Sequence, residues 1–469
     1  METDLKIEIL EALGSIYFSR GDNDKAIKTY EKLYEEAKKI DDFKHAAIAQ
    51  LGLGEIYFQK NIIKVANKKI TEGYKISEGI DYKYGIAKSK VLRCRILMNM
   101  NRLEELEKKL EEVLEYSNRH NLKDMLGDIY NLKGLLEYFS GNLERSIDYY
   151  NKSIKCYYET GQYIDSTKPM NNLATIYSDR GDYKKAMDYY ENALDIVDKE
   201  GNLHLKLTFL NNIGEIYMNI GKYSMAKSYI EEARNIALEI ENTSGKFTAT
   251  INLSLIYLYT HDYYNSYHLY QEIKKEFLHY ENFSMDVLSL YFDFLGEFYA
   301  AFGKWDEARK WSKKAIEICK DFNELYYLKA ESRMAFVDFY DKGKYDKVKF
   351  ESLRSKYRIT DFGMFKRRFF IELAIIAFVK GDYEYVYELL NEDEKYKEDN
   401  PSEVYDNVRK IILYKLKKDL DSINSLIKLE KELNKDNLIL VKVFNALILG
   451  SKLYENGIIM EPLTIFQKQ

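Results

Sequence analysis

The sequence predicts an all-α protein in which about ten or eleven antiparallel helix pairs stack in a row. Two observations predict this fold class. Residues that break helices are scarce, with 3 prolines and 23 glycines in 469 residues, whereas residues that favour helices are abundant. A short sequence element also recurs every 40 residues, which is typical of repeat proteins whose units stack on one another.

The recurring element marks the first helix of each pair. It places a small residue after an apolar one and an aromatic residue three positions later, as in Leu13-Gly14-Ser15-Ile16-Tyr17. Such spacings place side chains on one face of a helix. After residue 254 the register shifts by two residues. The small residue of the later copies is Gly54, Cys94, Gly134, Ala174, Gly214, Ser254 and Gly296.

A turn follows seven residues after the small residue and starts the second helix. Glycine suits this turn because it adopts positive φ at low cost and can end a helix. A small residue and a large one follow, as with Ala26 and Tyr30. We therefore expect the two helices to cross closely at Gly14 and Ala26, with Tyr17 and Tyr30 filling the wider gaps. The turn residues are Gly21, Gly141, Gly181, Gly221 and Gly303, replaced elsewhere by Asn61, Asn101 and His261.

The chain divides into a regular part, residues 1–320, and a divergent part, residues 321–469. Turn-like segments at Gly343-Lys344 and Gly381-Asp382 start second helices, but the first helices before them lack the Leu-Gly element. We expect breaks at residues 361–363 and 399–401, an eleventh pair over residues 401–434 and a C-terminal capping helix over residues 437–457. The divergent part is thus predicted to extend the stack without a separate globular domain.

The order of these residues resembles the tetratricopeptide repeat family over at least residues 7–320. The resemblance implies a right-handed superhelical solenoid whose first helices line a concave groove. The family's usual unit has about 34 residues, so a 40-residue unit implies helices that are longer by about a turn and a half in total. The long unit is similar to those of peptide-pheromone receptors of Gram-positive bacteria, of maltose-activator-like regulators and of spindle-orientation scaffolds of animals.

Composition and charge exclude several function classes. A net charge of −5 and a pI near 5.9 argue against direct nucleic-acid binding. No apolar stretch is long enough for a membrane span, and the N-terminus lacks the pattern of a secretory signal. We therefore expect a cytoplasmic protein with no membrane contact. Cys94, Cys156 and Cys319 lie far apart and are expected to be reduced thiols that pack as small hydrophobic residues.

Motifs that would carry catalysis are missing from the sequence. The six histidines are scattered, so no metal site is predicted. Gly221-Lys222-Tyr223-Ser224 looks superficially like a phosphate loop, but it lacks the upstream glycine and the preceding strand. Asp361-Phe362-Gly363 matches a kinase triplet only in its letters. The sequence thus predicts no enzyme, no catalytic residue, no metal and no cofactor.

Asparagines recur in the first helices of four successive repeats, just before the small residue. Asparagine is a poor helix former, so its position there needs a reason. By the resemblance, this part of the first helix lines the groove, where an asparagine can donate and accept hydrogen bonds at once and so clamp a peptide backbone. The asparagines are Asn131, Asn171, Asn172, Asn211, Asn212 and Asn252. Other residues expected to face the groove are Lys168, Thr175, Asp179, Thr208, Glu215, Asn219 and Thr248.

An alternative explanation of the asparagines stays open. They could bond to neighbouring helices, or reflect a genome that is rich in codons for lysine, isoleucine, asparagine and tyrosine. The 43 tyrosines need the same care. Most of them, such as Tyr17 and Tyr57, occupy core positions of the repeat, whereas Tyr138 and Tyr259 lie off the pattern and could reach the groove.

The predicted function is non-catalytic binding of a peptide or protein segment in the concave groove, in a signalling or regulatory receptor that closes on its ligand. The similar receptors usually carry an N-terminal output domain, whereas the first repeat here begins near Ile7. Output is therefore expected on a partner or beyond Gln469. The alternatives are a passive assembly scaffold and the sensory part of a larger signalling enzyme or transcription regulator. A homodimer is compatible with each of these.

Overall fold

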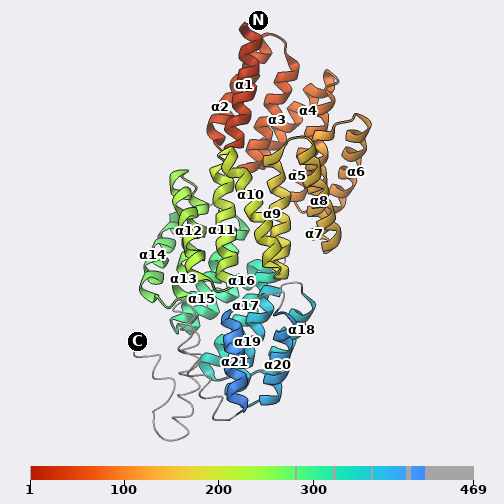
Figure 1. Ribbon diagram of the computed structural model, residues 1–469. Helices are drawn as coiled ribbons and strands as arrows, with labels where there is room; N and C mark the ends of the chain where they lie inside the picture. The colour runs from red at the N-terminus through yellow and green to blue at the C-terminus, as the bar shows by residue number, and fades with distance from the viewer. Residues whose placement is uncertain (1, 280–282, 321–323, 361–362, 398–402, 418–469) are drawn as a thin grey trace. The chain divides into compact units, whose positions relative to one another are not determined.

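The computed structural model describes residues 2–279, 283–320, 324–360, 363–397 and 403–417 (Figure 1). Every regular element in these ranges is a helix, which confirms the predicted all-α fold. Helices α1 to α20 form ten consecutive pairs, and α21 begins an eleventh. The helices are α1 (Glu2–Ser19), α2 (Asn23–Lys39), α3 (Phe43–Gln59), α4 (Ile63–Gly79), α5 (Lys83–Asn99), α6 (Leu103–Arg119), the short 3-10 helix η1 (Lys123–Met125), α7 (Leu126–Phe139), α8 (Leu143–Glu159), α9 (Tyr163–Arg180), α10 (Tyr183–Glu200), α11 (Leu203–Asn219), α12 (Tyr223–Glu239), α13 (Thr243–Tyr259), α14 (Tyr263–His279), α15 (Met285–Ala301), α16 (Trp305–Cys319), α17 (Glu324–Lys342), α18 (Lys347–Ile359), α19 (Gly363–Val379), α20 (Tyr383–Lys395) and α21 (Glu403–Lys417).

A residue with positive φ stands in the turn after each of the helices α1 to α13. At Gly21, two main-chain bonds close the turn: the Gly21 N–H donates to the Phe18 carbonyl at 3.0 Å and the Asp22 N–H to the Tyr17 carbonyl at 2.8 Å. The predicted turns at Asn61, Asn101 and His261 are confirmed. Further turns, which the sequence pattern did not reveal, lie midway between the predicted turns. Each 40-residue unit therefore consists of two halves of equal length. Positive φ occurs at residues 21, 41, 61, 81, 101, 121, 141, 161, 181, 201, 221, 241 and 261.

The core confirms that small residues let the paired helices approach. A Cβ atom on Gly14 would lie 2.9 Å from the ring of Tyr30, and one on Gly134 would lie 2.6 Å from the ring of Tyr150. Each glycine therefore makes room for a tyrosine of the second helix. Where glycine is missing, small residues still meet, because the hydroxyl oxygens of Ser254 and Ser266 lie 3.1 Å apart.

The chain forms two compact units. Unit 1 contains residues 1–176 and 188–209, and unit 2 contains residues 177–187 and 210–469. Residues of α9, α10 and α11 fall in both units. In unit 1 the core joins successive pairs through side chains such as Leu33 and Leu53. In unit 2 a large cluster includes Phe247, Phe294 and Phe298.

A long-range contact joins distant parts of unit 1. The Asn202 amide, in the turn before α11, donates to the Ser19 carbonyl at the end of α1. The ring of His204 lies against Gly21, where a Cβ atom would come within 2.2 Å of the ring. Burial lowers the pKa of His204, and the charge of Asp22 partly offsets this effect. The first turn of the chain is therefore fixed against a segment about 180 residues later in the sequence.

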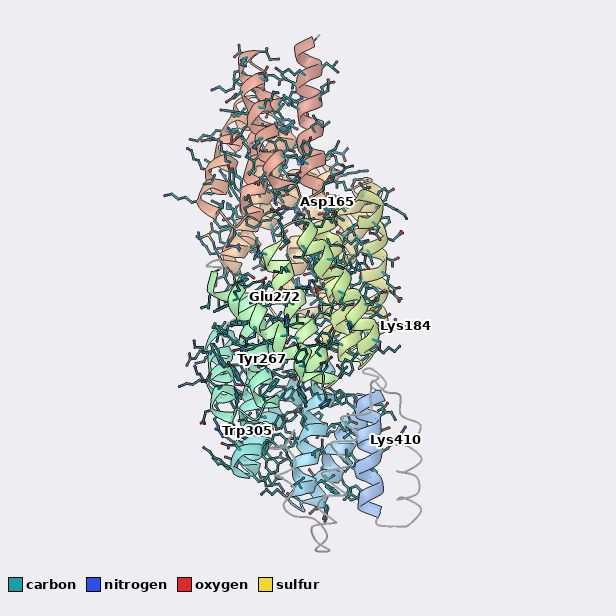
Figure 2. All side chains as sticks on the ribbon, turned by 90° about the vertical axis from the view of Figure 1, so that its left-hand side faces the viewer. Asp165, Lys184, Tyr267, Glu272, Trp305 and Lys410 are labelled. Atoms are coloured by element: carbon teal, nitrogen blue, oxygen red, sulfur yellow. The ribbon has the colours of Figure 1, made fainter. Side chains whose placement is uncertain are left out.

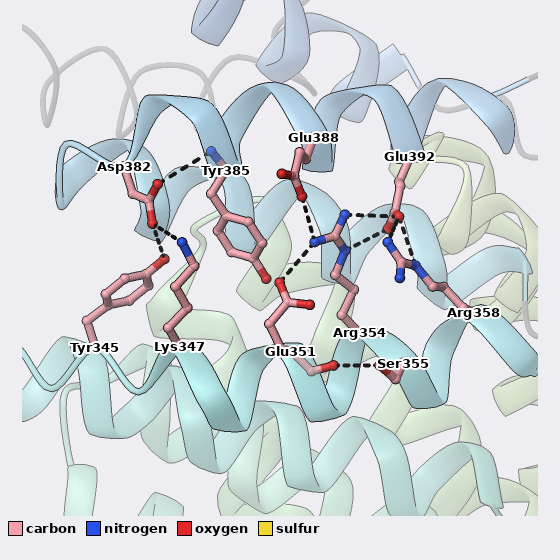
Figure 3. Close-up of polar contacts among 10 residues, drawn as sticks. All are labelled: Tyr345, Lys347, Glu351, Arg354, Ser355, Arg358, Asp382, Tyr385, Glu388 and Glu392. Atoms are coloured by element: carbon pink, nitrogen blue, oxygen red, sulfur yellow. Dashed lines mark hydrogen bonds and ion pairs between the residues drawn. The ribbon is translucent and has the colours of Figure 1, made fainter.

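The divergent part replaces small or apolar core residues with arginine. Arg354 on α18 is 5% exposed and donates to Glu351 at 2.9 Å, to Glu388 at 3.0 Å and to Glu392 at 3.0 Å (Figure 3). Arg358 also pairs with Glu392. These ion pairs join α18 to α20 and hold together a part of the stack that lacks the Leu-Gly element.

Some expected features of this part fall outside the described residues. They are residues 361–362 of the expected break at 361–363, the whole expected break at 399–401, residues 418–434 of the expected eleventh pair and the capping helix over residues 437–457. The described flanks show α19 beginning at Gly363 and α21 beginning at Glu403. Cys94 and Cys319 are buried, Cys156 is partly buried, and all three are free thiols.

Candidate functional site

Polar residues form columns on one face of the first helices, at positions that recur every 40 residues. We call this surface the first-helix face and treat it separately in each unit. Its positions are spaced by three or four residues along a helix, which places them on one side. On α9 and α11 the face consists of Lys168, Asn171, Asn172, Thr175 and Asp179, and of Thr208, Asn211, Asn212, Glu215 and Asn219, as the spacing predicts.

In unit 1 the asparagines bond across neighbouring first helices. The Asn172 amide on α9 donates to the Asn131 side-chain oxygen on α7 at 3.2 Å. Thr175 donates to the carbonyl of Asn171 at 3.0 Å, and its hydroxyl lies 3.3 Å from that of Tyr190. Part of the ladder in unit 1 is therefore an interhelical contact, as the alternative explanation of these asparagines expected.

Lys168 and Thr208 have local partners in unit 1. Lys168 pairs with Asp165, one turn away on α9 and labelled in Figure 2, at 2.7 Å. Its charge also helps to lower the pKa values of Glu55 and Asp128. Thr208 is exposed and donates to the His204 carbonyl at 3.1 Å.

In unit 2 two asparagines of α11 carry buried polar atoms without a hydrogen-bond partner among the described residues. These atoms are the side-chain oxygen of Asn211, which is 8% exposed as a residue, and the side-chain nitrogen of Asn219. Buried polar atoms are nearly always satisfied in native proteins, so each exception needs an explanation. Asn212 and Thr248 are partly exposed, whereas Asn252 is 4% exposed.

Two carboxylates lie on the first-helix face of unit 2. Burial, followed by the negative charge of Glu215, raises the pKa of Asp179 to about 7. Burial also raises the pKa of Glu215, and Lys329 partly offsets this rise. Both carboxyl groups therefore bind protons more readily than free carboxylates do, and a cation placed beside them would favour their charged forms.

The raised pKa of Asp179 makes stability depend on pH. The ordinary value is 3.8, so the folded chain binds the Asp179 proton more tightly than the unfolded chain does. Stability therefore falls as pH rises from about 4 to about 7 and stays reduced above that range. We expect Asp179→Asn to raise the free energy of unfolding at about pH 8 by about 2 kcal/mol, since partial solvent exposure reduces the full value.

The same substitution is expected to have little effect near pH 4, where Asp179 is protonated in both states. Urea unfolding followed by circular dichroism at both pH values measures the difference. Asp195→Asn, at an exposed position of α10, is the matched control. An equal effect of Asp179→Asn at both pH values would contradict the assignment.

An ion network that the sequence pattern did not reveal lies on the first-helix face of unit 1. Arg95 on α5 bridges Glu55 on α3 and Asp128 on α7. Lys88 lies 3.0 Å from Glu55, and the Tyr157 hydroxyl donates to Asp128 at 2.9 Å. Burial alone would raise the pKa of Glu55, but Lys88 and Arg95 hold it at about 2. Three consecutive first helices are thus joined by charge.

A second network joins first helices of unit 2. Asp293 on α15 pairs with Lys329 and with Arg333 on α17, each at 2.8 Å. Glu297 pairs with Arg333 at 3.3 Å and with Arg368 on α19 at 2.6 Å. The hydroxyl of Tyr259, one of the two off-pattern tyrosines expected to reach this surface, donates to Glu297 at 2.8 Å.

The repeat itself contains the signal for both networks. Glu55 and Arg95 stand one residue after the small residue of their copies, as do Thr175, Glu215 and Glu297. Lys88, Asp128 and Lys168 likewise share one position. When equivalent positions of successive repeats are compared, charges of opposite sign fall on adjacent first helices. When each helix is considered alone, the same charges are assigned to a solvated face.

The chemistry of the described residues favours binding. Among them no group of three or more histidine, cysteine, aspartate or glutamate side chains could hold a metal ion. None of the helices in the described ranges combines the length and the apolarity needed to cross a bilayer. What the first-helix face offers is amide donors and acceptors, carboxylates and cations, which suit a polar chain such as a peptide backbone.

Comparisons with known proteins agree with the repeat. Models of the tetratricopeptide repeat match residues 11–66, 125–199, 165–239 and 291–321. A Rap protein solved in complex with competence and sporulation factor superposes with a TM-score of 0.56 at 15% identity, covering 76% of this chain and 98% of that chain. The apo form of RapI gives a TM-score of 0.53 at 16% identity, covering 75% of this chain and 98% of its own.

These identities are low, so the likeness to the two Rap proteins concerns the fold. The apo form of the quorum sensor NprR from B. thuringiensis gives a TM-score of 0.49 at 14% identity, covering 77% of this chain and 99% of that chain. No curated protein sequence matches the chain.

Proposed function

Because the chain belongs to the tetratricopeptide repeat family, we propose that it is a non-catalytic regulatory protein whose first-helix face binds a peptide or protein segment. The observation that carries the proposal is the pair of unsatisfied atoms on α11. Asn211 presents an acceptor, and Asn219 presents a donor about two turns further along α11. The backbone of an extended peptide supplies both complementary groups, an N–H donor and a carbonyl acceptor.

The spacing of these two atoms fits a peptide. Eight residues of helix span about 12 Å, and an extended chain covers that length in three or four residues, at about 3.4 Å each. An N–H of the ligand would donate to Asn211, and a carbonyl three or four residues away would accept from Asn219. Such contacts recognise the backbone of the ligand. Selectivity for the side chains of the ligand would come from neighbouring groups such as Asp179 and Glu215.

Binding of this kind would change how repeats pack. The two amide atoms are covered in the present state, so a ligand reaches them when α11 shifts against its neighbours. A solenoid permits this shift because each repeat contacts mainly the next, and small changes add up along the stack. A ligand that binds one arrangement of the repeats more tightly than the other would shift the equilibrium between them, and this shift would carry the regulatory signal. A similarly folded Rap protein has been solved with competence and sporulation factor bound, which supports a peptide as the ligand.

One observation favours the alternative of an assembly scaffold. Tyr263, Tyr264 and Tyr267 lie together near the start of the second helix α14 and are 39%, 81% and 50% exposed (Figure 2 labels Tyr267). Exposed tyrosines are frequent anchors in protein interfaces. A partner on α14 would use the second helices and would leave the first-helix asparagines without a role in binding.

Affinity capture from the native cell extract, read by mass spectrometry, tests the proposal. The test variant changes Asn211, Asn212 and Asn219, all on α11 within unit 2, to alanine. The matched control changes three exposed asparagines of second helices, Asn118, Asn151 and Asn192, to alanine. We expect the wild type and the control to capture the same peptide or protein segment and the test variant to lose it. Equal capture by all three proteins would contradict binding at the first-helix face.

A further inference from the structure

Arg368 on α19 reaches back across the first-helix face of unit 2. Its guanidinium donates to the Tyr259 hydroxyl on α13 at 3.3 Å and to the Glu297 carboxylate on α15 at 2.6 Å. The Tyr259 hydroxyl donates to the same carboxylate oxygen at 2.8 Å, and the guanidinium lies 5.7 Å from the centre of the Tyr259 ring. A repeat of a solenoid ordinarily contacts its neighbours alone, whereas Arg368 reaches past α17 to helices two and three pairs earlier.

The two partners of Arg368 occupy the repeat positions of the candidate site. Tyr259 stands five residues after the small residue of its copy, as Asn219 does in the preceding pair. Glu297 stands one residue after the small residue, as Glu215 does. Arg368 therefore binds, from within the chain, the same repeat positions that the proposed function assigns to a ligand on α11.

This contact lies close to the covered end of α11. The ring centre of Tyr259 is 5.9 Å from that of Tyr223, and Tyr223 begins α12 directly after the turn that follows α11. Burial raises the pKa of Tyr223 to about 12, and the charge of Arg368 partly offsets this rise, as expected for neighbouring groups. Asn219, the last residue of α11, buries its side-chain nitrogen without a hydrogen-bond partner among the described residues. Arg368 thus acts on the part of the face where this nitrogen is covered.

Both ions of the contact have a second partner within reach. Glu372, one turn further along α19, lies 3.6 Å from the guanidinium of Arg368. Arg333 on α17 lies 3.3 Å from the carboxylate of Glu297. If Arg368 leaves Glu297, each charge keeps a partner of opposite sign, so the large cost of an unpaired buried charge is avoided. The contact therefore has two arrangements of similar free energy, as a switch requires.

We propose that Arg368 is a latch that holds α19 against α13 and α15 and so restricts access to the first-helix face at the end of α11. In the closed state Arg368 pairs with Glu297, and in the open state it pairs with Glu372 on its own helix. The role of the latch in regulation rests on the proposed function, because a ligand that binds the open state would shift the equilibrium towards it. The latch itself rests on the contacts of Arg368 alone.

Thiol labelling at residue 219 measures the opening without any ligand. Asn219→Cys places a thiol at the covered position, and peptide mass spectrometry gives the rate at which N-ethylmaleimide modifies that residue. In this background Arg368→Met removes the latch, and we expect labelling to become at least about fivefold faster. Arg309→Met is the matched control, because Arg309 on α16 pairs with Asp338 at 2.8 Å and with Asp341 at 2.5 Å on α17. We expect the control to stay within about twofold of its background.

A second variant changes the latch in the opposite direction. Glu372→Gln, in the same Asn219→Cys background, removes the partner of the open state and leaves the contact with Glu297 in place. We expect labelling to become at least about twofold slower at about pH 8, well above the ordinary titration range of a glutamate. An ion pair with a purely structural role predicts labelling that is unchanged or faster, because the variant removes one interaction of Arg368.

Two results would overturn the latch. They are equal labelling rates in the Arg368→Met and Arg309→Met variants, and labelling of the Glu372→Gln variant that is as fast as its background or faster. If circular dichroism shows that Arg368→Met loses helical structure, Glu372→Gln decides the question. Because labelling uses no ligand, these results are independent of the capture experiment, so a failure of the latch is distinguishable from a failure of the proposed function.

Discussion

Replacing Asp393 with leucine is expected to lower the free energy of unfolding by about 3–5 kcal/mol. Asp393 on α20 and Arg367 on α19 are both 0% exposed, and they meet at 2.8 Å. Arg367 also reaches Asp406 on α21 at 2.8 Å. Removal of Asp393 leaves much of the guanidinium charge buried, and an uncompensated buried charge costs more than the ion pair contributes.

Urea unfolding followed by far-ultraviolet circular dichroism measures this loss. The double variant Arg367→Met/Asp393→Leu removes both charges and should recover most of the stability. Asp306→Leu is the control because Asp306 is an exposed carboxylate paired with Arg309, and we expect a change below about 1 kcal/mol there. If Asp393→Leu cost no more than Asp306→Leu, the buried pair would not hold α19 to α20.

Replacing Tyr150 with alanine is expected to cost about 3–5 kcal/mol. Tyr150 on α8 is 1% exposed, and its ring fills the space above Gly134 on α7, where a Cβ atom would come within 2.6 Å. Because glycine has no side chain to move into the vacated space, the cavity stays largely open. The pairing of α7 with α8 depends directly on this contact.

Tyr158→Ala on the same helix is the matched control for Tyr150→Ala. Tyr158 is 46% exposed, so its removal should cost less than about 1 kcal/mol. The two variants differ from the wild type by the same chemical change, and urea unfolding compares them directly. Similar losses in both variants would show that the glycine–tyrosine contact does not stabilise the pair.

The fold was largely predictable because its cause is local and repeated. A small residue seven positions before a turn, repeated every 40 residues, locates each first helix. The turns that join one pair to the next were missed because four of them use Asp41, Asp81, Asn121 and Glu241 at positive φ, where no glycine marks the position. Only the interval of 20 residues between turns would have revealed them.

The divergent part was harder to predict because its core uses charge. Arg354 and Arg367 are buried and paired with carboxylates from the next second helix, whereas composition alone assigns arginine to the surface. Such pairs depend on which helices stack, and this cannot be read from one helix at a time.

The sequence predicts which residues share the candidate surface, but it does not predict the hydrogen bonds that their side chains make. The spacing places Asn171, Thr175 and Asp179 on one side of a helix, and all three lie in α9. The spacing could not show that Asn172 bonds to Asn131. It also could not show that Asn211 and Asn219 bury polar atoms without a hydrogen-bond partner, because the possible partners are residues distant in the sequence.

The central claim is that the first-helix face holds the ligand. The most direct test is titration of the captured ligand, by calorimetry, against the variant with alanine at Asn211, Asn212 and Asn219 and against the second-helix control. If two or three backbone hydrogen bonds are lost, each worth about 1 kcal/mol, the dissociation constant should rise about 30-fold or more in the first variant. It should stay within about twofold of the wild type in the control. Equal affinity in both variants would contradict the claim and place the ligand on another surface.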